Sequence, residues 1–358
     1  MEIRNLFSAN IPMQTTKWLL LHLKSDNMKH TCKKLSIIII CVLLCMTACR
    51  RGQEQQNPTE TPAQPVERPE FNADSAYAFV AAQCAFGPRV PNTEAHRQCG
   101  RYLTGTLRRF CDTVYVQEFT VRAYDGTVLK AKNIIGSFNP QADNRIMVAA
   151  HWDSRPCADQ DPDEANHRTP IEGANDGASG IGVLMEAARQ LRLHGTANGI
   201  DLICFDVEDY GAPQDAPSRS EDDWCLGSQH WAAHPHKTGY RARFGLLLDM
   251  VGGQNAQFCK EGTSLFYARD IMERVWNYAA QLGYSGTFSQ METSPIIDDH
   301  LYINRMTRIP MIDIIEYHGQ SGSGFNPTWH TLNDNLRNID RNTLQKVGEV
   351  LLYTIRNE

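Results

Sequence analysis

Two adjacent acids, Glu208 and Asp209, follow the mostly apolar run 200–205 and are the residues of this sequence best placed for chemistry. The apolar run predicts a buried strand, so both carboxylates would lie at a strand end. In such a pair one side chain can bind a metal ion while its neighbour moves protons at the same reacting centre. Adjacent acids in a loop are more often a solvated turn, so the interpretation depends on other residues.

Further polar side chains have comparable positions. His151 and Asp249 each follow directly on a short apolar run that predicts a buried strand. Asp176 lies in a loop of small residues before a predicted helix, where a cation and a substrate can approach its carboxylate closely. His330 comes late in the chain, directly after Trp329. Together these positions indicate a shared polar site.

The elements between these residues predict how they meet. Alternating patterns predict strands over 114–120, 130–135, 145–150, 200–205, 244–248 and 311–315, and helices over 73–86, 94–111, 181–191, 264–282 and 340–353. This order is typical of a single three-layer α/β/α domain with a mixed, mostly parallel central sheet. Such sheets bind ligands beyond the carboxyl ends of their strands, so scattered residues can converge there. Three oxygen and nitrogen ligands with one open coordination position would describe a catalytic zinc ion.

The N-terminal part predicts export. Lys33 and Lys34 precede an apolar stretch too short to span a bilayer comfortably, and small residues then lead to Cys49. Residues 28–49 therefore resemble a bacterial lipoprotein signal peptide in which Cys49 becomes the lipidated first residue. An ordinary cleavable signal peptide is the alternative. Since Met28 lies just ahead of the basic flank, residues 1–27 would be an extension from a mis-assigned start.

The rest divides into a linker and one domain. Residues 50–69 are rich in Gln, Glu, Pro and Thr and predict a disordered tether, which leaves 70–358 as the catalytic domain. The location expected is periplasmic, with an anchor in the inner or outer membrane. A net charge of −6 without a basic stripe argues against a nucleic-acid partner. The acids of 159–164 and 220–223 predict solvated surface.

Several short motifs are spread over residues 70–358. They are Gly87-Pro88-Arg89-Val90-Pro91, His151-Trp152-Asp153-Ser154, Asn175-Asp176, Glu208-Asp209, Leu248-Asp249 and Trp329-His330-Thr331. Taken together they resemble the zinc-aminopeptidase superfamily. Within it, Trp224-Cys225-Leu226-Gly227-Ser228, Asp298-Asp299-His300 and the segment 329–335 are similar to the glutaminyl-peptide cyclotransferases of animal type, which also occur in some bacteria.

The resemblance implies one zinc ion per chain, held by Asp176, Asp209 and His330. Two positions depart from the animal pattern. Asp209 stands where the animal enzymes carry glutamate, so its carboxylate reaches one methylene less far. Asp313 stands where they place a histidine, which changes the polar network there but not the metal ligands.

The activity that the resemblance implies is cyclisation of the N-terminal glutamine of a peptide or protein to pyroglutamate, with loss of ammonia. Glu208 would take a proton from the α-amine and return it to the leaving ammonia. Asp249 and Asp298 would share a proton beside it. Trp329, Trp224 and again Asp298 would line the substrate pocket, although ordinary core packing is an equal alternative for Trp224.

Two other functions stay open. A two-zinc aminopeptidase would use His151 and Asp249 to complete a second metal site bridged by Asp176, and Glu208 would deprotonate a bridging water. A catalytically inactive lipoprotein that uses the fold for binding is the third hypothesis, although an intact set of ligands argues against it. The acids at 298–299 favour the cyclase, because a compact ring closure suits a small acidic pocket.

Overall fold

A six-stranded mixed sheet runs through residues 66–358, the part of the chain that the computed structural model describes. In spatial order its strands are β1 (Thr113–Arg122), β2 (Val128–Phe138), β4 (Gly199–Phe205), β3 (Arg145–His151), β5 (Phe244–Asp249) and β8 (Met311–Ile315). The strands from β4 to β8 are parallel, while β1 and β2 form an antiparallel hairpin at one edge. The predicted signal peptide, its Cys49 and most of the predicted tether lie outside the described residues.

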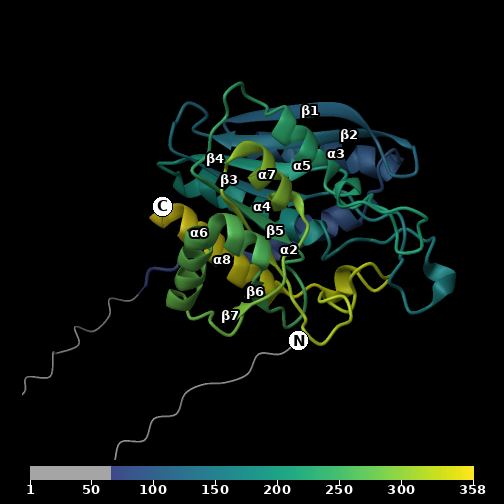
Figure 1. Cartoon of the computed structure of the whole chain (residues 1–358). Helices are drawn as coiled ribbons and strands as arrows, with labels where there is room; N and C mark the ends of the chain where they lie inside the picture. The colour runs from purple at the N-terminus through teal and green to yellow at the C-terminus, as the bar shows by residue number, and fades with distance from the viewer. Residues whose placement is uncertain (1–65) are drawn as a thin grey trace, which may run out of the picture. The chain divides into compact units, whose positions relative to one another are not determined.

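Helices cover both faces of this sheet, as Figure 1 shows. One face carries α2 (Ala73–Cys84), α3 (Glu94–Phe110), α4 (Ala178–His194), α6 (Gly262–Gln281) and α8 (Arg341–Asn357). The other face carries α5 (Leu226–Ala233) and α7 (Asp299–Thr307). A small parallel sheet of β6 (Phe258–Lys260) and β7 (Phe288–Glu292) and the 3-10 turns η1 (Glu164–Asn166), η2 (Glu221–Asp223) and η3 (Leu336–Asn338) complete the fold. The predicted three-layer α/β/α class is confirmed.

The central strand β3 is buried on both faces, which explains why its residues 146–150 are all apolar and do not alternate between polar and apolar side chains. Ile146 and Val148 belong to the larger hydrophobic cluster, which includes the α4 residue Leu184. Met147 and Ala149 belong to the cluster on the opposite face, under α5 and α7. A strand buried on both faces needs apolar residues at every position, which is typical of parallel sheets between helix layers.

The predicted helices and strands are all present, with ends that differ by a few residues. The sequence did not predict α5, α7, β6 or β7. All seven cysteines of residues 66–358 are free thiols. Within the same residues, no helix has both the length and the apolar character needed to cross a bilayer.

Candidate active site

The carboxyl ends of three parallel strands bring the predicted residues together. His151 is the last residue of β3, Asp249 is the last residue of β5, and Glu208 and Asp209 follow β4. Asp298 approaches from another direction, because it is the N-cap of α7. The predicted convergence at one edge of the sheet is therefore present in the structure.

Asp176, Asp209 and His330 form the first compact group. Their ligand atoms lie within 4.8 Å of one another, and all three side chains are buried. His330 Nε2 lies 3.2 Å from Asp209 Oδ1 and 3.5 Å from Asp176 Oδ2. The other carboxylate oxygen of Asp209, Oδ2, is buried without a hydrogen-bond partner. Since buried carboxylates are normally paired or coordinate a metal, two carboxylates and an imidazole in this arrangement fit a zinc ion.

A second group shares Asp176 with the first. His151 Nε2 lies 3.0 Å from Asp176 Oδ1 and 3.2 Å from Asp249 Oδ1. Burial alone would lower the pKa of His151, but hydrogen bonds with Asp153, Asp176 and Asp249 raise it well above its usual value. The ligand atoms of His151, Asp176 and Asp249 also lie within 4.8 Å of one another. Their spacing is therefore compatible either with a charged imidazole between two carboxylates or with a second metal ion.

Glu208 lies beside these groups and close to Asp298. The nearest polar atoms of Glu208, Asp298 and Cys225 lie within 4.8 Å of one another, and the Cys225 thiol donates to Glu208 Oε1 at 3.3 Å. Burial raises the pKa of Glu208 well above its usual value; the charge of His151 opposes this shift and Asp298 adds to it. Burial likewise raises the pKa of Asp249 to about 7. A carboxylate with a raised pKa is suited to accept a proton and give it back.

The backbone around Glu208 is fixed by a residue that the sequence did not single out. Asp153 accepts hydrogen bonds from the backbone N–H groups of Glu208 and Asp209 at 3.1 and 3.2 Å. Val207, just before them, has a left-handed backbone with φ 57°. A β-branched residue rarely adopts this conformation, so the surrounding contacts must hold it.

The same conformation recurs around the site. Cys225, Met250 and His330 have φ values of 57°, 48° and 53°. Cys225 contacts Glu208, Met250 follows Asp249, and His330 is itself in the proposed ligand group. Strained backbone of this kind clusters at functional sites, which supports the assignment of this region.

These groups open into a pocket of about 920 Å³. Trp329 stacks on the His330 ring, with centroids 3.7 Å apart and an angle of 24° between the planes. Trp224 lies nearly parallel to His330, at 6.0 Å and 9°. Both tryptophans line the pocket, as do Glu208, Asp249 and Asp298. Trp224 is therefore a pocket wall and not solely a core residue.

Asp313 lies deeper than the pocket, on β8. Its ligand atom falls within 4.8 Å of those of Asp298 and His300, and all three residues are buried. His300 Nε2 in turn faces Glu261 Oε1 at 3.2 Å. Asp298, which lines the pocket, therefore continues inward into a buried polar group with Asp313 and His300.

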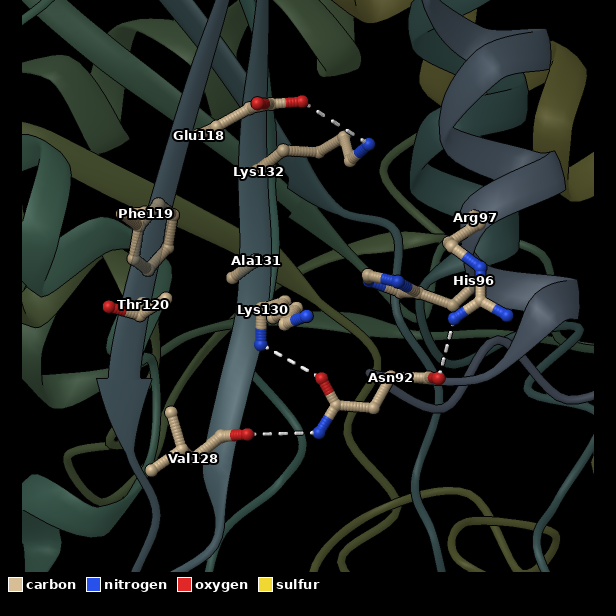
Figure 2. Close-up of a pocket in the computed structure, with 10 residues that line it drawn as sticks. All are labelled: Asn92, His96, Arg97, Glu118, Phe119, Thr120, Val128, Lys130, Ala131 and Lys132. Carbon is tan, nitrogen blue, oxygen red and sulfur yellow. Dashed lines mark hydrogen bonds and ion pairs between the residues drawn. The ribbon is translucent and has the colours of Figure 1, made fainter.

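A second hollow lies between α3 and the β1–β2 hairpin, and Figure 2 shows its lining. The Asn92 amide bonds to the backbone of β2 there, at 2.9 and 3.0 Å. His96 pairs with the buried Asp206 at 2.9 Å, and Lys132 faces Glu118 at 3.8 Å. Because these polar groups already have partners within the protein, the hollow offers no reactive constellation comparable to that of the first pocket.

Comparisons with known proteins give a consistent picture. Residues 133–355 match the family model described as peptidase family M28. The glutaminyl-peptide cyclotransferase of Bothrops jararaca is 27% identical over 247 residues, which cover 61% of this chain and 63% of that protein. The chain thus matches less than two thirds of the length of this curated relative.

Two solved structures are more similar. The glutaminyl cyclase of Bacteroides thetaiotaomicron, bound to N-acetylhistamine, is 53% identical, with a TM-score of 0.80 over 82% of this chain and 100% of that one. A Zn-dependent exopeptidase from Parabacteroides distasonis is also 53% identical, with the same TM-score of 0.80 over 82% of this chain and 100% of that one.

Proposed function

This chain belongs to peptidase family M28 and is similar to a bacterial glutaminyl cyclase, and we propose that it converts the N-terminal glutamine of peptides and proteins to pyroglutamate with release of ammonia. The observation that carries the proposal is the position of Glu208. It has a raised pKa, faces Asp298, and lies in one pocket with two tryptophans and with the group of Asp176, Asp209 and His330.

Asp176, Asp209 and His330 would hold one zinc ion per chain. Bound there, zinc supplies a Lewis acid that polarises the γ-carboxamide of the substrate glutamine. In the reaction the α-amine nitrogen bonds to the carboxamide carbon, and the bond from that carbon to the amide nitrogen breaks. Glu208 accepts the proton that the attacking amine loses and returns it to the departing ammonia. Glu208 therefore ends the reaction in the protonation state in which it began.

The other pocket residues prepare the substrate. Trp329 and Trp224 present flat walls that fold the glutamine side chain back toward its own amine, which is a proximity effect. Asp249 and Asp298 line the same pocket, and burial raises the pKa of both. They would share a proton and bind the substrate amine or Glu208.

The test of this function is direct. The purified protein is incubated with a peptide that begins with glutamine, and free ammonia and the mass loss of one ammonia per peptide are measured. An aminoacyl-anilide serves as the hydrolysis substrate in parallel. We expect ammonia release without anilide cleavage. Free amino acids with intact glutamine termini would instead establish an exopeptidase.

A two-zinc aminopeptidase is the second candidate, because the group of His151, Asp176 and Asp249 has the spacing of a metal site. It predicts two zinc ions per chain, whereas the cyclase predicts one. Metal analysis of the purified protein, together with the two substrates, separates these functions. A protein without bound metal and without either activity would revive the hypothesis of a binding lipoprotein.

We also propose that the protein is exported and anchored to a membrane through a lipid on Cys49, on the strength of the sequence pattern of residues 28–49. Replacement of Cys49 by serine is expected to move the protein from the membrane fraction to the soluble fraction, because serine cannot carry the thioether-linked lipid. Fractionation followed by immunoblotting measures this. Unchanged membrane association of the variant would rule out the anchor.

A further inference from the structure

Arg155 lies under the floor of the pocket and is fully buried. Its guanidinium donates two hydrogen bonds to the carboxylate of Asp159, from Nε at 2.7 Å and from Nη2 at 2.8 Å. Its remaining nitrogen, Nη1, donates to the backbone oxygen of Asp209 at 3.0 Å and faces Asp209 Oδ1 at 3.4 Å. One rigid fork therefore contacts both Asp159 and the proposed metal ligand Asp209.

Asp159 connects this fork to a second ligand. Its Oδ1 lies 3.4 Å from Nδ1 of His330, the ring nitrogen that does not face the acids of the metal group. The backbone N–H of the next residue, Gln160, donates to the His330 carbonyl at 3.1 Å. Asp159 is nearly buried, with 7% of its side chain exposed, so the prediction of solvated surface is wrong for it. Burial would raise its pKa, but the hydrogen bonds from Arg155 hold that pKa well below the usual range.

The same guanidinium supports a wall of the pocket. The central carbon of Arg155 lies 4.6 Å from the centre of the Trp224 ring, within the range of a cation–π contact. Trp224 is the residue that lies parallel to His330. Arg155 thus links Asp209 directly, and His330 through Asp159, to an aromatic side chain that lines the pocket.

We propose that Arg155 and Asp159 are positioning residues for the metal site. Asp159 Oδ1 is the acid oxygen that faces the buried His330 Nδ1 at 3.4 Å, and that nitrogen has no hydrogen-bond partner among the described residues. With a metal ion on Nε2, Asp159 would accept the Nδ1–H and fix that tautomer. Arg155 holds Asp159 and Asp209 at a set separation. A histidine ligand oriented by an outer carboxylate binds its metal more tightly, and loss of such a partner typically weakens binding by about 10–100-fold.

The arrangement also addresses the shorter side chain at Asp209. An aspartate reaches one methylene less far than a glutamate, so its backbone must be held closer to the metal. The hydrogen bond from Arg155 to the Asp209 carbonyl fixes that backbone directly. The inference rests on the metal site of the proposed function and not on which reaction the pocket performs.

The test measures zinc affinity by competition with a chelator in protein stripped of metal and reloaded. Asp159→Asn keeps the shape but removes the charge, and we expect zinc affinity to fall by about 10–100-fold. In Arg155→Met the zinc affinity should fall by a similar factor. Arg155→Lys should recover only part of the affinity, because an ammonium cannot make the two-pronged contact with Asp159.

The chain offers a matched pair of controls on its surface. Arg168 and Asp215 form an exposed ion pair at 2.7 Å, with 74% and 66% of their side chains exposed. Arg168→Met and Asp215→Asn repeat the chemical changes away from the metal group, and exposed pairs contribute little. We expect both to bind zinc within about twofold of the parent protein, because neither contacts a proposed ligand.

Cobalt(II) in place of zinc adds a readout that a purely structural ion pair would not move. If Asp159 orients His330, Asp159→Asn shifts the visible absorption of the cobalt protein. Variants that melt at a lower temperature but keep both zinc affinity and cobalt spectrum would overturn the inference. If the variants bind zinc more weakly but the parent protein forms no pyroglutamate, the positioning role of Arg155 and Asp159 is supported and the proposed cyclase function is wrong.

Discussion

Replacement of Glu208 by glutamine is expected to remove most turnover while zinc content stays unchanged. Glutamine has the same shape as glutamate but cannot accept the proton of the attacking amine. General acid–base catalysis contributes about 10²–10⁴-fold to the rate, so kcat should fall by that factor. Because Glu208 is not in the group of Asp176, Asp209 and His330, metal analysis should give the same stoichiometry as for the parent protein.

Glu221→Gln is the matched control. Glu221 also lines the pocket but is exposed, and its side chain pairs loosely with Arg305 at 3.8 Å. The same chemical change there should leave the rate of ammonia release within about twofold of that of the parent protein, since exposed ion pairs contribute little to stability. Full activity of the Glu208 variant would remove the acid/base role from this residue.

Replacement of His330 by alanine is expected to empty the metal site. The imidazole is the only nitrogen ligand of the proposed set, and two buried carboxylates without it hold a cation less well. The loss in zinc affinity should exceed the roughly 10–100-fold expected when only an outer partner is removed. Zinc analysis of the purified variant and its ammonia release measure the two consequences.

The control for that change is His167→Ala. His167 lies in the loop after η1, where its ring contacts the backbone oxygen of Asp161 at 2.7 Å. It is not in any of the acid and histidine groups around the pocket. Zinc content should therefore be retained in this variant, and an unchanged stoichiometry in His330→Ala would exclude the ligand role.

The strand ends explain why so much of the site was predictable. His151, Glu208 and Asp249 each follow an apolar run that is buried on both faces, and in a parallel sheet such runs finish along one edge. Local sequence therefore carries information about a long-range arrangement. No apolar run precedes His330, so only the sequence motif around it indicated that it belongs to the site.

The residues that were missed depend on partners distant in sequence. Asp159 lies in an acidic segment that has the pattern of solvated surface, and its burial follows from its contact with His330. The one local signal is Arg155, four residues earlier. Asp153 belongs to the motif at residues 151–154, but nothing nearby in the sequence predicts its hydrogen bonds to the backbone after β4.

The missed elements have weak local signals too. Helix α5 is 8 residues long and begins after Cys225, which is left-handed and provides no side-chain cap. Helix α7 does have a cap, because Asp298 accepts from the N–H of Asp299. The sequence indicated only a role in the pocket for Asp298, whereas in the structure it both lines the pocket and caps α7.

The left-handed backbone at Val207 has a consequence for protein engineering. A glycine would adopt this conformation at lower cost, but Val207 is fully buried in a hydrophobic cluster with Leu129 and Leu226, and removal of its side chain would leave a cavity that offsets that gain. The packed valine also restricts the motion of the backbone that carries the following carboxylate, Glu208. Core packing and the position of Glu208 therefore both favour retention of Val207, and libraries built around it should be scored on stability and on turnover together.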